Sequence, residues 1–273
     1  MKLGMALSFI GMGMLGVAAA RGATGGDQIL DGIGETALIA RYLFNGDVRD
    51  ASRNGFDARR ETGEEDAADA FSEDASLGTV LSLPGGDGGC YLRIPGQALA
   101  GADSLAVTGW WFLRSEGEGG LLFDFRSGET RRFAARLGEG NAGLHARLIG
   151  RAGDYRAAAP NIRMPRREWI HLAVVFDASQ QAIRLYRNGE RVGRVEGVGL
   201  AMDEVFDFEN AEANRLYLGG APDAAGLDAA LHDVRLYNVG LTDDDVRRIY
   251  RGTSRTEEDE PDGEPEADGY RWK

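Results

Sequence analysis

The chain is poor in cysteine, and this limits how the fold can be stabilised. Its 273 residues include one cysteine, Cys90, so the folded protein has no internal disulfide bond. Stability must therefore come from a packed core. No motif places a histidine where it would activate the thiol, and we expect Cys90 to be a half-buried small residue.

Proline and several functional motifs are also scarce or absent. The sequence has 7 prolines against 40 glycines, and 43% of its residues are hydrophobic. This composition suits many tight turns between strands and does not suit a disordered Pro/Gly-rich polymer. The sequence contains no phosphate-binding glycine loop, no paired cysteines at metal-binding spacing and no Gly-x-Ser-x-Gly motif. Nothing in it therefore indicates nucleotide chemistry, a zinc site or a serine hydrolase.

A basic face is the next feature that is missing. The formal net charge is −13, with 31 Lys and Arg against 44 Asp and Glu. Acidic residues concentrate at 61–74 and 257–268, so the rest of the chain is close to neutral. A nucleic acid needs a basic surface for its phosphates, and we therefore predict no nucleic-acid partner.

Long hydrophobic runs are absent apart from residues 3–20. This run follows Lys2 and ends in three alanines at 18–20, the small-residue pattern of a signal-peptide cleavage site. We predict a signal peptide at 1–20, a glycine-rich lead-in at 21–36 and a secreted or periplasmic protein. The alternative is an uncleaved N-terminal anchor, because the run approaches the length of a membrane span. No membrane contact beyond this segment is predicted.

The sequence does contain short alternating apolar runs. Residues 168–177 (EWIHLAVVFD) are apolar at both parities, which is typical of a strand covered on two faces. Residues 181–190 (QAIRLYRNGE) alternate and end near Asn188-Gly189, a strong hairpin signal because a type I′ turn needs positive φ at two positions. Further runs recur at the spacing of about 8 to 12 residues that is typical of an all-β sandwich. The stretch 242–250 begins with a capping signal and predicts one short helix.

In their order along the chain, these runs resemble the laminin-G-like jelly roll of the concanavalin A-like lectin and glucanase group. The central run is similar to the W-x-H strand and N-G hairpin of that family, and residues 230–238 (ALHDVRLYN) are similar to its G-x-I-D-E-V-R-I-Y-N strand. The resemblance covers about 37–252. It implies an all-β fold, a two-sheet antiparallel jelly-roll sandwich with one short C-terminal helix. Residues 253–273 are acidic without apolar periodicity, which predicts a disordered tail.

Some members of this group are retaining glucanases, which carry two glutamates and an aspartate on one strand face. Two of their carboxyl groups lie about 5 Å apart and act as nucleophile and acid/base. The nearest match here is Glu204, Asp207 and Glu209, but Glu204 has the opposite parity and the segment lies in a variable stretch. We therefore predict no catalytic residues, and a glycan-cleaving enzyme is the weakest of the functional alternatives.

One structural calcium ion is the cofactor that the sequence can support. Asn45, Asp47 and Asp50 place oxygen ligands in one tight loop, and hard cations prefer such ligands. The resemblance implies a shared ligand from an aspartate of a later strand. His232 stands at that position here, and Asp233 next to it should face the other way. We expect either a metal-free Asx-turn loop or weak calcium binding, and no other cofactor.

Sugar-binding sandwiches use exposed aromatic rings, because the apolar face of a sugar stacks on them. Trp110 and Phe112 share one strand face and Trp111 lies on the other, so one of these faces belongs to the core. The candidate platforms are Trp110, Tyr155 and Tyr186, with plain packing as the alternative for each.

The sequence thus predicts an exported, non-enzymatic binding module. Its expected partner is a glycan or another extracellular or cell-surface macromolecule, such as a protein. The alternative is a structural or protein-interaction sandwich without affinity for sugar. His171, in the central run, is expected to be a packed, hydrogen-bonded core residue.

Overall fold

The structure is a computed structural model that describes residues 37–61, 70–86, 89–115 and 119–253. The expected signal peptide at 1–20, the lead-in at 21–36 and the expected tail beyond residue 253 lie outside the described residues. No helix in the described part of the chain is long and apolar enough to cross a membrane.

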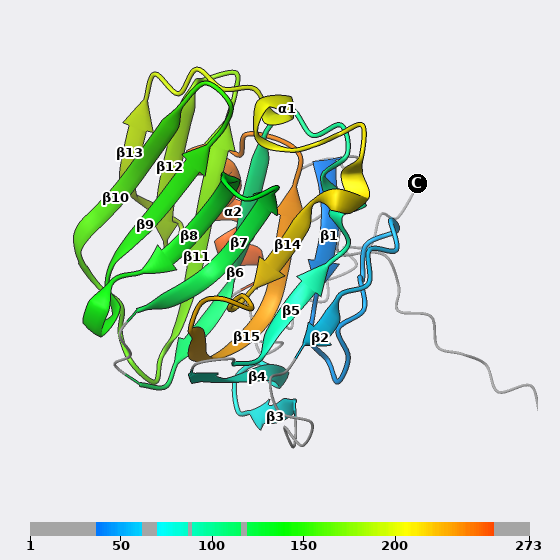
Figure 1. Cartoon of the computed structure of the whole chain (residues 1–273). Helices are drawn as coiled ribbons and strands as arrows, with labels where there is room; N and C mark the ends of the chain where they lie inside the picture. The colour runs from blue at the N-terminus through cyan, green and yellow to red at the C-terminus, as the bar shows by residue number, and fades with distance from the viewer. Residues whose placement is uncertain (1–36, 62–69, 87–88, 116–118, 254–273) are drawn as a thin grey trace, which may run out of the picture.

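Two antiparallel sheets form the molecule (Figure 1). The eight-stranded sheet has the order β13 (Glu190–Glu196), β12 (Ala182–Arg187), β11 (Trp169–Asp177), β6 (Leu105–Leu113), β15 (Gly226–Tyr237), β4 (Gly78–Gly86) and β3 (Phe71–Asp74), and β1 (Leu38–Tyr42) also pairs with β15. The seven-stranded sheet has the order β10 (Asp154–Arg163), β9 (Ala142–Ile149), β8 (Arg131–Leu137), β7 (Gly120–Ser127), β14 (Arg215–Leu218), β5 (Tyr91–Ile94) and β2 (Arg59–Glu61). The predicted all-β, two-sheet sandwich is confirmed.

The Asn188-Gly189 hairpin joins β12 to β13 as the sequence predicts. Both residues have positive φ, 50° at Asn188 and 78° at Gly189, and Arg187 pairs with Glu190 across the turn. The Asn188 side chain also accepts a hydrogen bond from the backbone N–H of His171 at 2.9 Å. The turn therefore fixes the register of the hairpin and ties it to β11.

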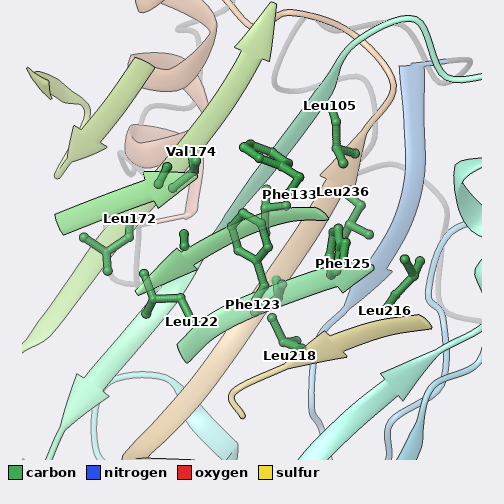
Figure 2. Packing of buried hydrophobic residues seen from close by; sticks show 14 of the residues in the cluster. Leu105, Leu122, Phe123, Phe125, Phe133, Leu172, Val174, Leu216, Leu218 and Leu236 are labelled. Atoms are coloured by element: carbon green, nitrogen blue, oxygen red, sulfur yellow. The ribbon is translucent and has the colours of Figure 1, made fainter. Parts of the chain in front are cut away.

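The main core lies between the two sheets and is rich in phenylalanine and leucine (Figure 2). The ring of Phe133 on β8 lies 5.2 Å from that of Phe123 on β7 and 6.5 Å from that of Phe176 on β11, so it links the sheets. Trp111 points into this core and is 2% exposed. Cys90 is buried here as well, more deeply than expected.

A second apolar cluster lies on the outer face of the eight-stranded sheet, beneath helix α2 (Asp243–Thr253). Val246 and Ile249 of the helix are buried in a cluster that includes Val175 of β11 and Tyr186 of β12. The predicted cap is present, since the Asp245 carboxylate accepts hydrogen bonds from both the N–H and the hydroxyl of Thr242. This helix explains why β6 and β11 are apolar at both parities.

Short helical segments connect some of the strands. They are α1 (Met202–Val205) and the 3-10 turns Gly96–Leu99, Glu139–Asn141 and Ala211–Ala213. Met202 and Val205 of α1 belong to the main core.

Candidate functional site

A hollow of about 670 Å³ lies on the outer face of the seven-stranded sheet. Its lining comes from β7, β8, β9 and β10 and from the turn at 223–225. These strands alternate: one parity supplies the core between the sheets, and the other supplies the polar lining of the hollow. The hollow is therefore a property of the whole sheet face and not of one loop.

Strand register explains which residues meet in the hollow. Ala134 on β8 pairs with Asp124 on β7 and with Arg147 on β9, and Arg147 pairs with Arg156 on β10. Ala158 pairs with His145 in the next row. Small alanine side chains thus lie among long ones, and the hollow forms over them.

Arg126 organises one side of the hollow. Its guanidinium bonds Asp124 Oδ2 at 2.7 Å and makes two bonds to the Asp223 carboxylate, at 2.7 and 3.0 Å. These bonds lower the pKa of Asp223. Burial alone would lower the pKa of Arg126, but its bonds to the two carboxylates raise it overall. Asp124 is fully buried, and its other oxygen, Oδ1, accepts no hydrogen bond from any described residue.

The arginines on the opposite side of the hollow make fewer ion pairs and hydrogen bonds with carboxylates. Arg147 forms a bidentate pair with Asp154, at 2.9 and 2.6 Å, which lowers the pKa of that carboxyl. Arg156 reaches the same carboxylate at 3.4 Å. Arg136 is exposed, and among the described residues it makes no ion pair. Arg132 reaches Asp124 at 3.5 Å, a loose contact.

Tyr91 and Tyr217 lie beside the hollow on the same sheet face. Tyr217 pairs in register with Asp124, and its ring lies edge-on to that of Tyr91 at 5.4 Å. Arg126 stacks over the Tyr217 ring at 5.4 Å. Sequence reasoning missed this pair, although both tyrosines alternate with buried leucines in their strands (YLRI and RLYL), which is the signal for an outward position.

Helix α2 covers Trp110 and Tyr186. The prediction that these two rings are exposed platforms for sugar is wrong. Trp110 is 7% exposed, donates Nε1–H to the Thr253 hydroxyl at 2.9 Å and packs against Tyr250. Tyr186 is fully buried and donates its hydroxyl to Asp243 at 2.8 Å. The sequence places Trp110 and Trp111 on opposite faces of their strand, but it shows neither which face belongs to the core nor that a helix covers the other.

The third predicted platform, Tyr155, lies on β10 of the other sheet, so the structure does not bring the three aromatics together. Its half-buried ring packs against the main core beside Gly153. Whether Tyr155 contacts a ligand stays a prediction.

The predicted calcium loop is held by hydrogen bonds. Asp50 Oδ1 accepts from the backbone N–H of Arg41 and of Ser52, and Oδ2 accepts from the Ser52 hydroxyl and the N–H of Phe56. A carboxylate has about four acceptor positions, so those of Asp50 are filled. Asp47 bonds Arg49, and the third predicted ligand, Asn45, is exposed.

The aspartate next to the expected second calcium ligand is already paired with arginine side chains. Asp233 is 5% exposed and bonds the guanidinium groups of Arg41 and Arg235 at 2.7 to 3.0 Å. Burial opposes its charge, but these arginines hold the pKa of Asp233 well below its usual range. Its φ of 44° accompanies a register shift between His232 and Arg235. Loop and strand therefore do not fit a shared calcium ion, and no group of three acidic, His or Cys side chains suited to a metal occurs within the described ranges.

The nearest match to a glucanase triplet does not form a strand face. Glu204 lies in α1, and its Oε2 accepts a hydrogen bond from the Ala201 N–H at 2.8 Å. Asp207 accepts one from the Asn210 N–H, and Phe206 between them is fully buried. Glu204, Asp207 and Glu209 therefore belong to a structured connection in which two of the three acids cap local backbone.

Together, the two packed sheets and the polar hollow define a lectin-like β-sandwich. A family model described as the concanavalin A-like lectin/glucanases superfamily (Laminin_G_3) matches residues 85–247, more than half of the chain. The chain belongs to this family. No curated protein sequence matches it at a significant level.

Solved structures with this fold include binding domains. Domain 4 of AbnA, a GH43 extracellular arabinanase from Geobacillus stearothermophilus, solved with arabinotriose, is 22% identical with a TM-score of 0.57, over 80% of this chain and 100% of that one. The binding domain of botulinum neurotoxin serotype D/C VPI 5993 is 11% identical with a TM-score of 0.57, over 80% of this chain and 53% of that one. A structure of botulinum neurotoxin type C, whose cell entry depends on interaction with two ganglioside molecules, is 11% identical with a TM-score of 0.57, over 81% of this chain and 52% of that one. The chain thus spans about half of the toxin domains, and at these identities the likeness establishes the fold.

Proposed function

We propose that this chain is a non-enzymatic module that binds a glycan in the hollow over β7 to β10. The observation that carries the proposal is the open sheet face itself, where alanines at 134 and 158 leave about 670 Å³ among arginine and histidine side chains. Ligand sites commonly have volumes of about 300 to 1,000 Å³ and combine apolar lining with a few fixed polar groups.

The chemistry of the lining suits sugar hydroxyls. Arg136, Arg147 and His145 offer N–H donors to the oxygen atoms of a sugar. Tyr91, half-buried in a smaller neighbouring hollow of about 240 Å³ on the same sheet face, offers a ring for stacking.

The carboxylates of the hollow are poor candidates for glycoside hydrolysis. Asp124 and Asp223 both bond the guanidinium of Arg126, and this arrangement lowers the pKa of Asp223. A general acid for this reaction needs a raised pKa, so that it carries a proton at neutral pH. The pairing therefore supports binding without cleavage.

The structural neighbours support the same class of ligand. The arabinanase domain was solved with arabinotriose and one toxin binding domain with SialylT, and cell entry of botulinum neurotoxin type C depends on interaction with two ganglioside molecules. Each of these statements concerns the other protein. Their shared fold makes a sugar the first ligand to test here.

Filling the hollow tests the proposal. Ala134→Trp places a large ring on the floor of the hollow without entering the core, and Ala75→Trp makes the same change in the exposed turn between β3 and β4. On a glycan array we expect wild type and Ala75→Trp to bind the same sugars, and Ala134→Trp to lose at least about tenfold in affinity. No glycan bound by the wild type, or equal binding by Ala134→Trp, would reject this site.

We also propose that the module is exported through cleavage after residue 20, because residues 3–20 have the pattern of a signal peptide. N-terminal sequencing of the protein from its native source should begin at Arg21. A start at Met1 in the membrane fraction would show an anchor instead.

A further inference from the structure

The charge of the hollow differs in sign from that of the whole protein. The chain has a net charge of −13. The lining of the hollow nevertheless contains five arginines, which outnumber the three aspartates at or beside it. The arginines are at 126, 132, 136, 147 and 156, and the aspartates are at 124, 154 and 223. Since the excess acidic residues concentrate at 61–74 and 257–268, the hollow is a local positive site on a part of the chain that is otherwise close to neutral.

The internal ion pairs do not use all of this positive charge. Arg126 is held between two carboxylates, and Arg147 is paired with Asp154. Arg132 and Arg136 lie on the same face of β8, on either side of Ala134. Arg132 reaches Asp124 only at 3.5 Å, and Arg136 makes no ion pair among the described residues. They are four residues apart, which corresponds to roughly 13 Å along a strand.

From this arrangement we infer that the ligand is an acidic glycan, whose sugars carry carboxylate or sulfate groups. This inference rests on the proposed glycan-binding function and narrows its ligand class. A guanidinium matches a carboxylate or sulfate with two parallel N–H···O bonds. Arg132 and Arg136 bind the acidic groups, and the sugar rings lie over Ala134 between them.

The glycan is favoured over a nucleic acid by the rest of the surface. Nucleic-acid sites combine an extended basic stripe with aromatic rings on which bases stack. Here the arginines of the hollow alternate with aspartates in place of an extended basic stripe, and the nearby Tyr217 ring is 6% exposed beneath Arg126. A nucleic acid is therefore kept as a contradicting outcome of the test.

The test compares acidic and neutral probes on the mature protein by titration calorimetry. Polygalacturonate carries carboxylates, heparin carries sulfates as well, arabinan and a β-glucan are neutral, and single-stranded DNA is a polyanion that is not a glycan. We expect polygalacturonate or heparin to bind at least about tenfold more tightly than the neutral glycans, and this binding to weaken as salt is raised from 50 to about 300 mM. The carboxylate and sulfate arms identify which acid is preferred.

Matched variants locate the effect. Arg132→Gln and Arg136→Gln should each weaken binding of the preferred acidic glycan by about tenfold, since each removes one charge-assisted contact. Arg194→Gln, an exposed arginine on β13 of the other sheet, should leave it unchanged. Melting temperatures of the three variants should stay within a few degrees of wild type.

Several results would overturn the inference. Equal or tighter binding of a neutral glycan, unaffected by the two β8 variants, would refute the acidic ligand and leave the proposed function standing. No binding of any glycan would refute both. Equally tight binding of single-stranded DNA, or an equal loss in Arg194→Gln, would show general attraction of polyanions in place of a specific site.

Discussion

At the scale of single residues, arginines decide what the buried acids do. Asp233 is bound by Arg41 and Arg235, and Asp177 by Arg184 at 2.5 Å. A buried carboxylate that is paired in this way stays ionised and anchors neighbouring strands. Asp177 and Asp233 therefore hold neighbouring strands in place, and acidic residues in the sequence were poor guides to a metal site.

His171 gives a prediction at this scale. It is 1% exposed beside Trp110 and Tyr250, and burial, reinforced by the nearby Arg235, lowers its pKa to about 3, while Asp233 acts weakly in the other direction. The unfolded chain takes up a proton below about pH 6.5 and the folded chain does not. As the pH is lowered from roughly 6 to 4, the free energy of unfolding should therefore fall by up to about 1.4 kcal/mol for each pH unit.

Urea denaturation at a series of pH values checks this prediction. Burial also lowers the pKa of His232, so both histidines contribute to the slope in the same direction. His171→Gln should reduce the slope without abolishing it. An unchanged slope in His171→Gln would mean that His171 is protonated in the folded protein.

At the scale of elements, local patterns were reliable wherever the sequence alone sets the geometry. The Asn188-Gly189 turn and the cap at Thr242 were predicted because φ and hydrogen bonding are decided within a few residues. The parity of Trp110 and Trp111 was predicted as well. Which parity faces the core could not be, because both are apolar and α2 covers the outer one.

The opening loop gives the prediction at this scale. Because Asp50 already accepts four hydrogen bonds and Asp233 is bound by arginines, any calcium should bind weakly, near the millimolar end of the range for extracellular modules. Adding EDTA should lower the melting temperature by about 1 °C or less.

Asp50→Ala distinguishes a loop held by hydrogen bonds from a loop held by calcium. It should destabilise the protein equally with and without EDTA, because it removes hydrogen bonds that hold the loop. A large fall in the melting temperature of wild type in EDTA, reversed by calcium, would contradict this account.

At the scale of the whole molecule, the two outer faces of the sandwich differ in what covers them. Helix α2 covers one of them (Figure 1). The hollow opens on the other. The hollow could not be predicted from the sequence, because Asp124, Ala134, Arg147 and Arg156 meet only through the register of four strands. The sequence patterns indicate where the strands lie, but the site forms only when these strands pair in the observed register.

The most direct test of the account is a crystal structure of the mature protein with the best-binding oligosaccharide from the array. We predict sugar rings over Ala134, with polar contacts to Arg136 and His145 and a ring edge near Tyr91. Sugar bound on the eight-stranded sheet or at the loop near Asp50, with the hollow free, would contradict the central claim.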